Sequence, residues 1–121
     1  MNCLLLLDDE RNIEDVTWID YSKYTGYFLY TVRNVQQARD FIIKHDHNFK
    51  DLVFSLDHDL QDFHEDGEET GYTFTRWLVN YIVDNGHDLD DLNVIVHSKN
   101  PIGKQNIEKY VENAKKFYGE L

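Results

Sequence analysis

The sequence is poor in the residues that interrupt or cross-link a chain. It has one proline, one cysteine and six glycines in 121 residues, so an intrachain disulfide is excluded and no proline- or glycine-rich linker marks a domain boundary. The single thiol, Cys3, lies in an apolar run, where a buried and unreactive cysteine is expected. We therefore expect one domain, residues 1–121, in a reducing compartment, that is, a cytoplasmic protein.

Basic residues and long apolar segments are also scarce. Twelve lysines and arginines stand against 23 aspartates and glutamates, which gives a net charge of -11, and a field of that sign repels nucleic acid and anionic membranes. The run from Met1 to Leu7 is too short for a signal core or a membrane span. We expect no membrane contact, and a phosphate ligand would need a cation, placed basic residues or a helix N-terminus.

Four short apolar runs predict β-strands. The first, Cys3 to Leu7, is uninterrupted and ends in acids, as expected of a strand buried on both faces of a parallel sheet. Between the first two runs, Glu10 to Gly26 is only weakly periodic, so we expect an irregular crossover with a short helix near Asp15. The other runs cover Tyr27 to Val32, Leu52 to Leu56 and Val94 to Val96.

Three segments have the apolar spacing of α-helices. One begins at the N-cap Asn34 and should end near His45, and a second is stopped by Asn85-Gly86. The third begins at Asn100-Pro101 and should reach about Tyr118. The residues expected to face inward are Ala38, Phe41 and Ile42 in the first; Phe74, Trp77, Leu78, Tyr81 and Ile82 in the second; and Ile107, Tyr110, Val111, Ala114 and Phe117 in the third.

The alternation of strands and helices predicts an open, doubly wound α/β sheet with strand order 2-1-3-4. Ligands bind such sheets at the carboxyl ends of the strands, and every strand here ends in polar residues. The exits carry Asp8-Asp9-Glu10, Arg33, Asp57-His58-Asp59 and His97-Ser98-Lys99-Asn100. Carboxylates forced together repel by roughly a few kcal/mol, so such a cluster requires protonation, cationic partners or a metal such as Mg²⁺, Mn²⁺ or Ca²⁺. The alternative is that Asp8 and Asp9 only terminate a strand and that Asp57 and Asp59 cap a loop.

The remaining polar residues at these exits have more than one interpretation. His58 and His97 are candidates for metal ligands, for a general acid and base, or for plain hydrogen-bonded residues. Ser98 has no nucleophile setting and is expected to donate to a phosphate oxygen. The segment 100–103, with Lys99 beside it, offers amides and positive charge to an anion, although ordinary helix capping explains it equally well.

At these residues the chain resembles the cyclic-phosphate processing receiver-like family. The family strings are Leu-Asp-Asp-Glu-Arg, Ser-Leu-Asp-His-Asp-Leu, Thr-Gly before a helix and His-Ser-x-Asn-x-x-Gly, matched here by Leu7 to Arg11, Ser55 to Leu60, Thr70-Gly71 and His97 to Gly103. The resemblance spans nearly the whole chain. It implies a receiver-like (flavodoxin-like) three-layer sandwich over residues 1–121 with a four-stranded, mainly parallel sheet.

The resemblance also implies a phosphoesterase-like function on cyclic-phosphate ends or nucleotides, linked to RNA processing. The partner would be a phosphate-containing small molecule or an RNA end, and the cofactor Mg²⁺ or Mn²⁺. By matching position, the metal would be held by Asp8, Asp9, Asp57 and Asp59. The catalytic candidates are Asp57, His58, His97 and Ser98, and the substrate-binding candidates are Arg33, Lys99, Asn100 and Gly103.

Two other functions fit the residues. In a signalling receiver, Asp57 would accept a phosphoryl group beside Mg²⁺, but no fifth strand ending in a lysine is predicted. In a non-catalytic acidic binding protein, the loop Gln61 to Glu69 would contact a basic protein partner; most charges of this loop are expected to be solvated.

Overall fold

A computed structural model of the chain describes residues 2–44 and 48–119. Within these ranges four strands form one parallel sheet in the order β2-β1-β3-β6, which confirms the predicted α/β class and strand order. The strands are β1 (Cys3–Leu7), β2 (Phe28–Val32), β3 (Leu52–Leu56) and β6 (Val94–Val96). Three bounds are those predicted, and β2 begins one residue later than expected.

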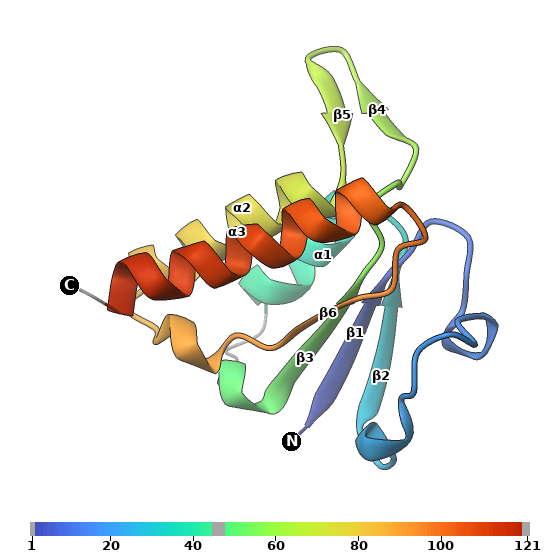
Figure 1. Ribbon diagram of the computed structural model, residues 1–121, viewed down its shortest axis with the longest axis horizontal. Helices are drawn as coiled ribbons and strands as arrows, with labels where there is room; N and C mark the ends of the chain where they lie inside the picture. The colour runs from blue at the N-terminus through green and yellow to red at the C-terminus, as the bar shows by residue number, and fades with distance from the viewer. Residues whose placement is uncertain (1, 45–47, 120–121) are drawn as a thin grey trace.

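The α-helices pack side by side on one face of this sheet, where α1 contacts α2 and α2 contacts α3 (Figure 1). They are α1 (Val35–Lys44), α2 (Gly71–Asp84) and α3 (Pro101–Gly119). The expected end of the first helix at His45 lies outside the described residues. Phe117 was expected to face inward, but 59% of it is exposed; the packed row continues from Ala114 to Tyr118, four residues on, instead.

The opposite face of the sheet is covered by the segment of residues 10–26 (Figure 1). This segment is irregular, with the short 3₁₀ turns η1 (Ile13–Asp15) and η2 (Ser22–Tyr24), as the weak periodicity predicted. Leu4 and Leu6 of β1 are buried on this side, whereas Leu5 and Leu7 belong to the helical core. A strand covered on both faces must be apolar at every position, which explains the uninterrupted run.

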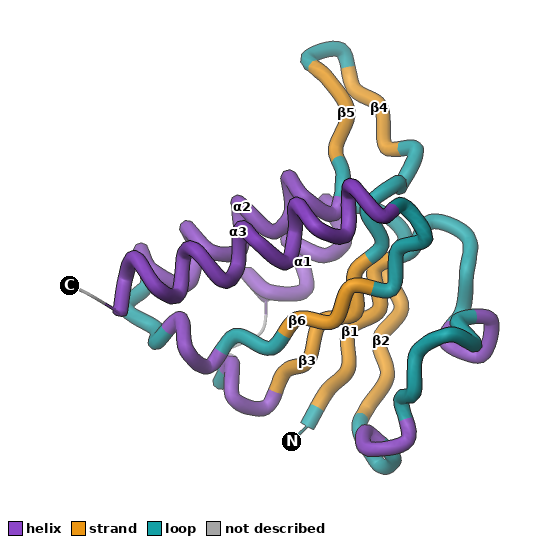
Figure 2. Tube along the Cα trace, in the orientation of Figure 1, coloured by secondary structure: helices purple, strands orange, loops and turns teal. Residues whose placement is uncertain are grey.

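The segment of residues 61–69, expected to be a loop, is instead an antiparallel β-hairpin of β4 (Asp62–His64) and β5 (Gly67–Glu69) that projects from the body (Figure 2). Gly67 makes the turn with a φ of 137°. An Asp62 oxygen accepts the Val35 amide at 3.1 Å, and Glu69 pairs with Arg39 at 3.0 Å. These contacts tie the base of the hairpin to α1, so an unstructured loop was the wrong expectation. The expected solvation of its charges is confirmed at the tip, where His64, Glu65, Asp66 and Glu68 are exposed.

Two further short turns, η3 (Phe49–Asp51) and η4 (Leu89–Asp91), precede β3 and β6. Among the described residues, no helix is both long enough and apolar enough to span a bilayer.

The start of α2 packs directly on the exit of β3. Thr70 caps the helix, because its Oγ1 accepts the amide of Thr73 at 3.2 Å and Thr73 Oγ1 accepts the Thr70 amide at 2.8 Å. The Gly71 amide donates to the His58 carbonyl at 3.0 Å. A Cβ atom at Gly71 would overlap the carbonyl oxygen of Asp57. This glycine therefore lets the helix approach the backbone that carries Asp57.

Gly71→Ala is expected to lower the free energy of unfolding by roughly 1–3 kcal/mol, the usual range for an overpacked position. The physical reason is that the backbone of Asp57 must move to admit the methyl group. Urea unfolding measures the change. Gly119→Ala is the control, since a Cβ there has nothing within 4 Å; equal midpoints for the two variants would contradict the prediction.

Candidate functional site

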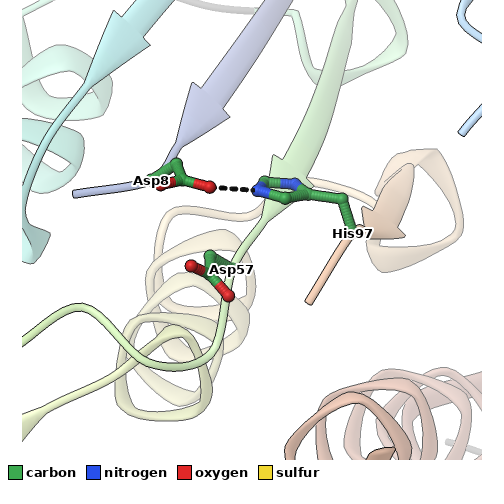
Figure 3. Close-up of side chains that lie close together, drawn as sticks. All are labelled: Asp8, Asp57 and His97. Atoms are coloured by element: carbon green, nitrogen blue, oxygen red, sulfur yellow. Dashed lines mark hydrogen bonds and ion pairs between the residues drawn. The ribbon is translucent and has the colours of Figure 1, made fainter. Parts of the chain in front are cut away.

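The carboxyl ends of three neighbouring strands bring Asp8, Asp57 and His97 together. They follow β1, β3 and β6, and each offers one ligand atom within 4.8 Å of the others (Figure 3). All three residues are buried. The sheet topology forces this meeting, because parallel strands deliver their exits to the same edge.

The Asp8 carboxylate accepts four hydrogen bonds. Its Oδ1 accepts the amides of Glu10 and Arg11 at 2.9 and 2.8 Å, and its Oδ2 accepts His97 Nε2 at 2.9 Å and Arg11 Nη1 at 3.3 Å. Burial alone would raise the pKa of Asp8, but the two amides and His97 outweigh it and the pKa is lowered. The Asp8 carboxylate is therefore ionised, and protein donors supply the hydrogen bonds that water would otherwise make.

Asp57 lies beside Asp8 with less support. Its Oδ1 accepts the His58 amide at 2.8 Å, and its Oδ2 is 3.5 Å from Arg11 Nη1. Burial first, and then the charge of Asp8, raise the pKa of Asp57. Burial and the charges of neighbouring carboxylates likewise raise the pKa of Asp9. Both acids hold a negative charge that a proton or a cation would stabilise.

A cleft of about 360 Å³ opens beside these residues. It brings acidic, basic and neutral polar side chains from the exits of β1, β3 and β6 into one hollow. Its lining residues are Asp9, Glu10, Arg11, Asp57, Asp59, Gln61, Ser98, Lys99 and Asn100. Six of the residues singled out from the sequence thus line one cleft, while Asp8 and His97 are buried beside it.

His58 and Gly103 lie where β3 meets the start of α3. His58 Nδ1 is 2.8 Å from Asp59 Oδ1, and Asn100 Nδ2 donates to Asp59 Oδ2 at 3.2 Å. The hydrogen bond from His58, with help from Asn100, overcomes burial and lowers the pKa of Asp59. Asn100 Oδ1 accepts the Gly103 amide at 3.0 Å, and a Cβ at Gly103 would overlap the His58 ring. The Gly103 amide therefore serves the helix cap.

Arg33 takes a different place from the one expected of a substrate-binding residue. Its guanidinium donates to the carbonyls of Arg11 and Asp8 at 2.7 and 3.3 Å, and to Asn12 Oδ1. It is not among the described residues that line the cleft. Its contacts hold the backbone of residues 8–12 in place.

Sequence reasoning missed four residues around the site: Arg11, Trp18, Tyr21 and Ser55. Arg11 lies over the ring of Trp18 at 5.2 Å from its centroid, as does the expected Lys99 at 4.1 Å, and Trp18 Nε1 donates to the His97 carbonyl at 2.8 Å. Tyr21 and Ser55 form a hydrogen-bonded chain to His97. Arg11 stands in the first family string and Ser55 is the polar residue of an apolar strand, but no pattern marks Trp18 or Tyr21.

The comparisons with known proteins give one match. A family model described as the cyclic-phosphate processing Receiver domain matches residues 3–113. No curated protein and no solved structure matches the chain.

Asp8→Asn and Asp57→Asn are expected to change the free energy of unfolding in opposite directions at pH 7. The folded pKa of Asp8 lies below its ordinary value of 3.8, so its ionised form stabilises the fold above that pH and the contribution is lost as pH falls through the folded pKa. The folded pKa of Asp57 lies above 3.8, so its ionised form opposes folding once pH rises through that pKa.

Asp8→Asn should therefore destabilise the protein and Asp57→Asn should stabilise it. Urea unfolding at pH 7 and in steps down toward pH 4 measures both. The gain from Asp57→Asn should shrink toward the acidic end, and two changes of the same sign at pH 7 would contradict the pKa ordering.

Proposed function

This chain belongs to the cyclic-phosphate processing receiver family, and on that premise we propose that its cleft binds a cyclic phosphate, on a nucleotide or an RNA end, and opens the ring with a divalent cation. One observation carries the proposal. The cleft joins the acids Asp9, Asp57 and Asp59 to the bases Arg11 and Lys99, a combination that suits a cation and a phosphoryl group side by side.

The donor set fits Mg²⁺ or Mn²⁺. Burial first, and then the charges of neighbouring carboxylates, raise the pKa values of Asp57 and Asp9, and a divalent cation would offset both effects. In the part of the chain that the structure describes, the ligand atoms that lie within 4.8 Å of one another belong to Asp8, Asp57 and His97. Asp57 would therefore bind the cation directly, and Asp9 and Asp59 in the cleft wall would contact it through its bound waters. Asp8 could join only if Arg11 withdrew, since its oxygens already accept four hydrogen bonds. When bound, the cation would polarise the phosphoryl oxygens.

The phosphate would lie toward the start of α3. Lys99 supplies a positive charge, and Ser98 lies beside it in the cleft, where its Oγ accepts the Asn100 amide at 3.1 Å and its hydroxyl bonds to Asp57. Donation from Ser98 to a phosphate oxygen would require release of Asp57. Arg11 would add a second positive charge from the opposite strand exit. The net charge of -11 repels an anionic ligand at long range. Within the cleft, these two basic side chains would attract it.

Proton transfer would fall to His58. Ring opening needs a water oxygen to bond phosphorus while one ribose oxygen leaves; the water gives up a proton and the leaving oxygen takes one. His58 is oriented by Asp59 at 2.8 Å, and an imidazole held by a carboxylate is suited to either transfer near neutral pH. Its side chain is partly exposed beside the cleft, unlike that of His97.

The enzymatic proposal is tested with 2′,3′-cyclic nucleotides and RNA ending in a cyclic phosphate, incubated with EDTA, Mg²⁺ or Mn²⁺. We expect metal-dependent formation of the phosphate monoester. His58→Gln should reduce the rate by roughly 10²-fold, as for loss of a general acid or base. His64→Gln is a matched control, because His64 forms a similar 2.8 Å pair with Asp62 on the hairpin.

Chromatography of the products decides the outcome. No monoester from the unmodified protein with either metal would end the proposal. If acetyl phosphate instead gives an acid-labile adduct that Asp57→Asn abolishes, the chain is a phosphoacceptor. The position of Asp57 in the cleft wall beside Asp9 is the observation that favours this alternative.

Arg11→Gln is expected to tighten Mn²⁺ binding by roughly tenfold, because a unit charge about 4 Å away in a partly buried site is worth one to several kcal/mol. The Arg11 guanidinium lies 3.3 Å from Asp8 Oδ2 and 3.5 Å from Asp57 Oδ2, and repels any cation there. Titration calorimetry measures the affinity. Arg39→Gln, which removes a guanidinium paired with Glu69, is the control; weaker Mn²⁺ binding by Arg11→Gln than by the control would refute the competition.

A further inference from the structure

A buried chain of hydrogen bonds leads from Asp8 to the face of the sheet that residues 10–26 cover. His97 Nε2 lies 2.9 Å from Asp8 Oδ2, His97 Nδ1 lies 2.8 Å from Ser55 Oγ, and Ser55 Oγ lies 2.6 Å from Tyr21 Oη. Asp8, His97 and Ser55 are each 0% exposed. We call Tyr21, Ser55, His97 and Asp8 the relay. Its members come from four separate parts of the chain.

The direction of each hydrogen bond in the relay follows from its Asp8 end. Both oxygens of Asp8 accept groups that can only donate, two backbone amides and a guanidinium, so Asp8 is an acceptor throughout and His97 Nε2 carries a proton. A second proton on Nδ1 would place a full positive charge on a completely buried ring near Arg11. Nδ1 therefore accepts from the Ser55 hydroxyl.

Ser55 in turn accepts from Tyr21. Burial raises the pKa of the Tyr21 hydroxyl, which therefore keeps its proton and donates it to Ser55 Oγ. Every donor in the relay thus points toward Asp8. Hydrogen bonds aligned in one direction polarise one another, and a fully satisfied buried network holds its side chains in one arrangement.

We infer that Tyr21, Ser55 and His97 are positioning residues that fix the Asp8 carboxylate, and through it the strand exit carrying Asp9 and Arg11. Asp8 Oδ1 binds the amides of Glu10 and Arg11, so the orientation of Asp8 sets the path of the backbone that turns into the cleft. His97 does not transfer protons to a ligand in the cleft, because both ring nitrogens are engaged in the relay and the ring is fully buried.

The segment 10–26 holds His97 at two points. Tyr21 reaches its ring through Ser55, and Trp18 Nε1 donates to its backbone carbonyl at 2.8 Å. A serine in the middle of a buried strand is costly unless its hydroxyl is paired, and alanine or valine would fill the position without that requirement. The hydrogen bonds of Ser55 to a histidine on one side and a tyrosine on the other therefore explain why a serine can occupy this buried position.

His97→Gln separates positioning from proton transfer. A glutamine amide can donate to Asp8 from nearly the place of Nε2 but cannot shuttle a proton, whereas His97→Ala removes the donor. Ser55→Ala and Tyr21→Phe interrupt the relay farther from Asp8. Tyr24→Phe is the matched control, because Tyr24 lies in the same segment, packs its ring on Tyr27 and takes no part in the relay.

Two measurements are made on the full chain. Nitrogen-15 NMR at neutral pH should show His97 with a protonated Nε2 and a hydrogen-bonded, unprotonated Nδ1, and Ser55→Ala should move the Nδ1 resonance toward that of a free imidazole nitrogen. Mn²⁺ affinity, which rests on the proposed function, should fall about tenfold or more in His97→Ala and Ser55→Ala, as for the loss of groups that orient a ligand. His97→Gln, which keeps the donor to Asp8 but loses the acceptor of Ser55, should bind Mn²⁺ more tightly than His97→Ala, and Tyr24→Phe should remain near the unmodified protein.

A protonated Nδ1 in the unmodified protein would overturn the inference. So would Mn²⁺ binding by His97→Gln as weak as by His97→Ala, or a Ser55→Ala protein with both its spectrum and its affinity unchanged. If the unmodified protein binds no Mn²⁺, the proposed cation site fails, and the NMR measurement still decides the relay. Should His97→Ala not fold, Tyr21→Phe and His97→Gln carry the same comparison.

Discussion

The buried carboxylates of Asp8 and Asp57 repel each other, and the arrangement of the surrounding donors depends on that repulsion. The parallel sheet brings both acids to one edge, and the protein treats them unequally. Asp8 receives two amides, a histidine and a guanidinium, whereas Asp57 receives one amide, the Ser98 side chain and a more distant contact with Arg11. The pKa of Asp8 is lowered and that of Asp57 is raised. The environment thus separates the two acids: hydrogen bonds fix Asp8, and Asp57 is the acid that the proposed function assigns to a cation.

The sequence predicts most of the fold because strands buried in a parallel sheet are visible in it as short apolar runs. A strand covered on both faces must be almost wholly apolar, so β1 is visible as an uninterrupted run and β3 as a run broken only by Ser55, each with a sharp polar end. The exits then follow from topology alone, which is why Asp9, Asp57, Asp59, Ser98, Lys99 and Asn100 could be grouped before any contact was known.

The parts that could not be predicted depend on long-range contacts without a local pattern. The hairpin of residues 62–69 is short and highly charged, and its anchors, Asp62 on the α1 amide and Glu69 on Arg39, join positions far apart in the sequence. Trp18 and Tyr21 lie in a segment without periodicity, so nothing local says that one reaches the His97 backbone and the other its ring. Arg11 was visible in a motif, but its place between two carboxylates depends on how the strand exits meet.

The irregular segment of residues 10–26 orders the two basic side chains that the proposed function assigns to a phosphate. A crossover helix would cover the sheet mainly with apolar side chains, whereas this segment supplies an indole and a phenol whose apolar bodies pack and whose polar tips bond. The Trp18 ring lies under both Arg11 and Lys99 and supports these cations beside the cleft. Binding a ligand costs less conformational entropy when the long basic side chains that contact it are already ordered. The net charge of -11 opposes any phosphate at long range. Under the proposed function, the local order of these two cations and a metal held by the neighbouring acids would give the cleft its attraction for one.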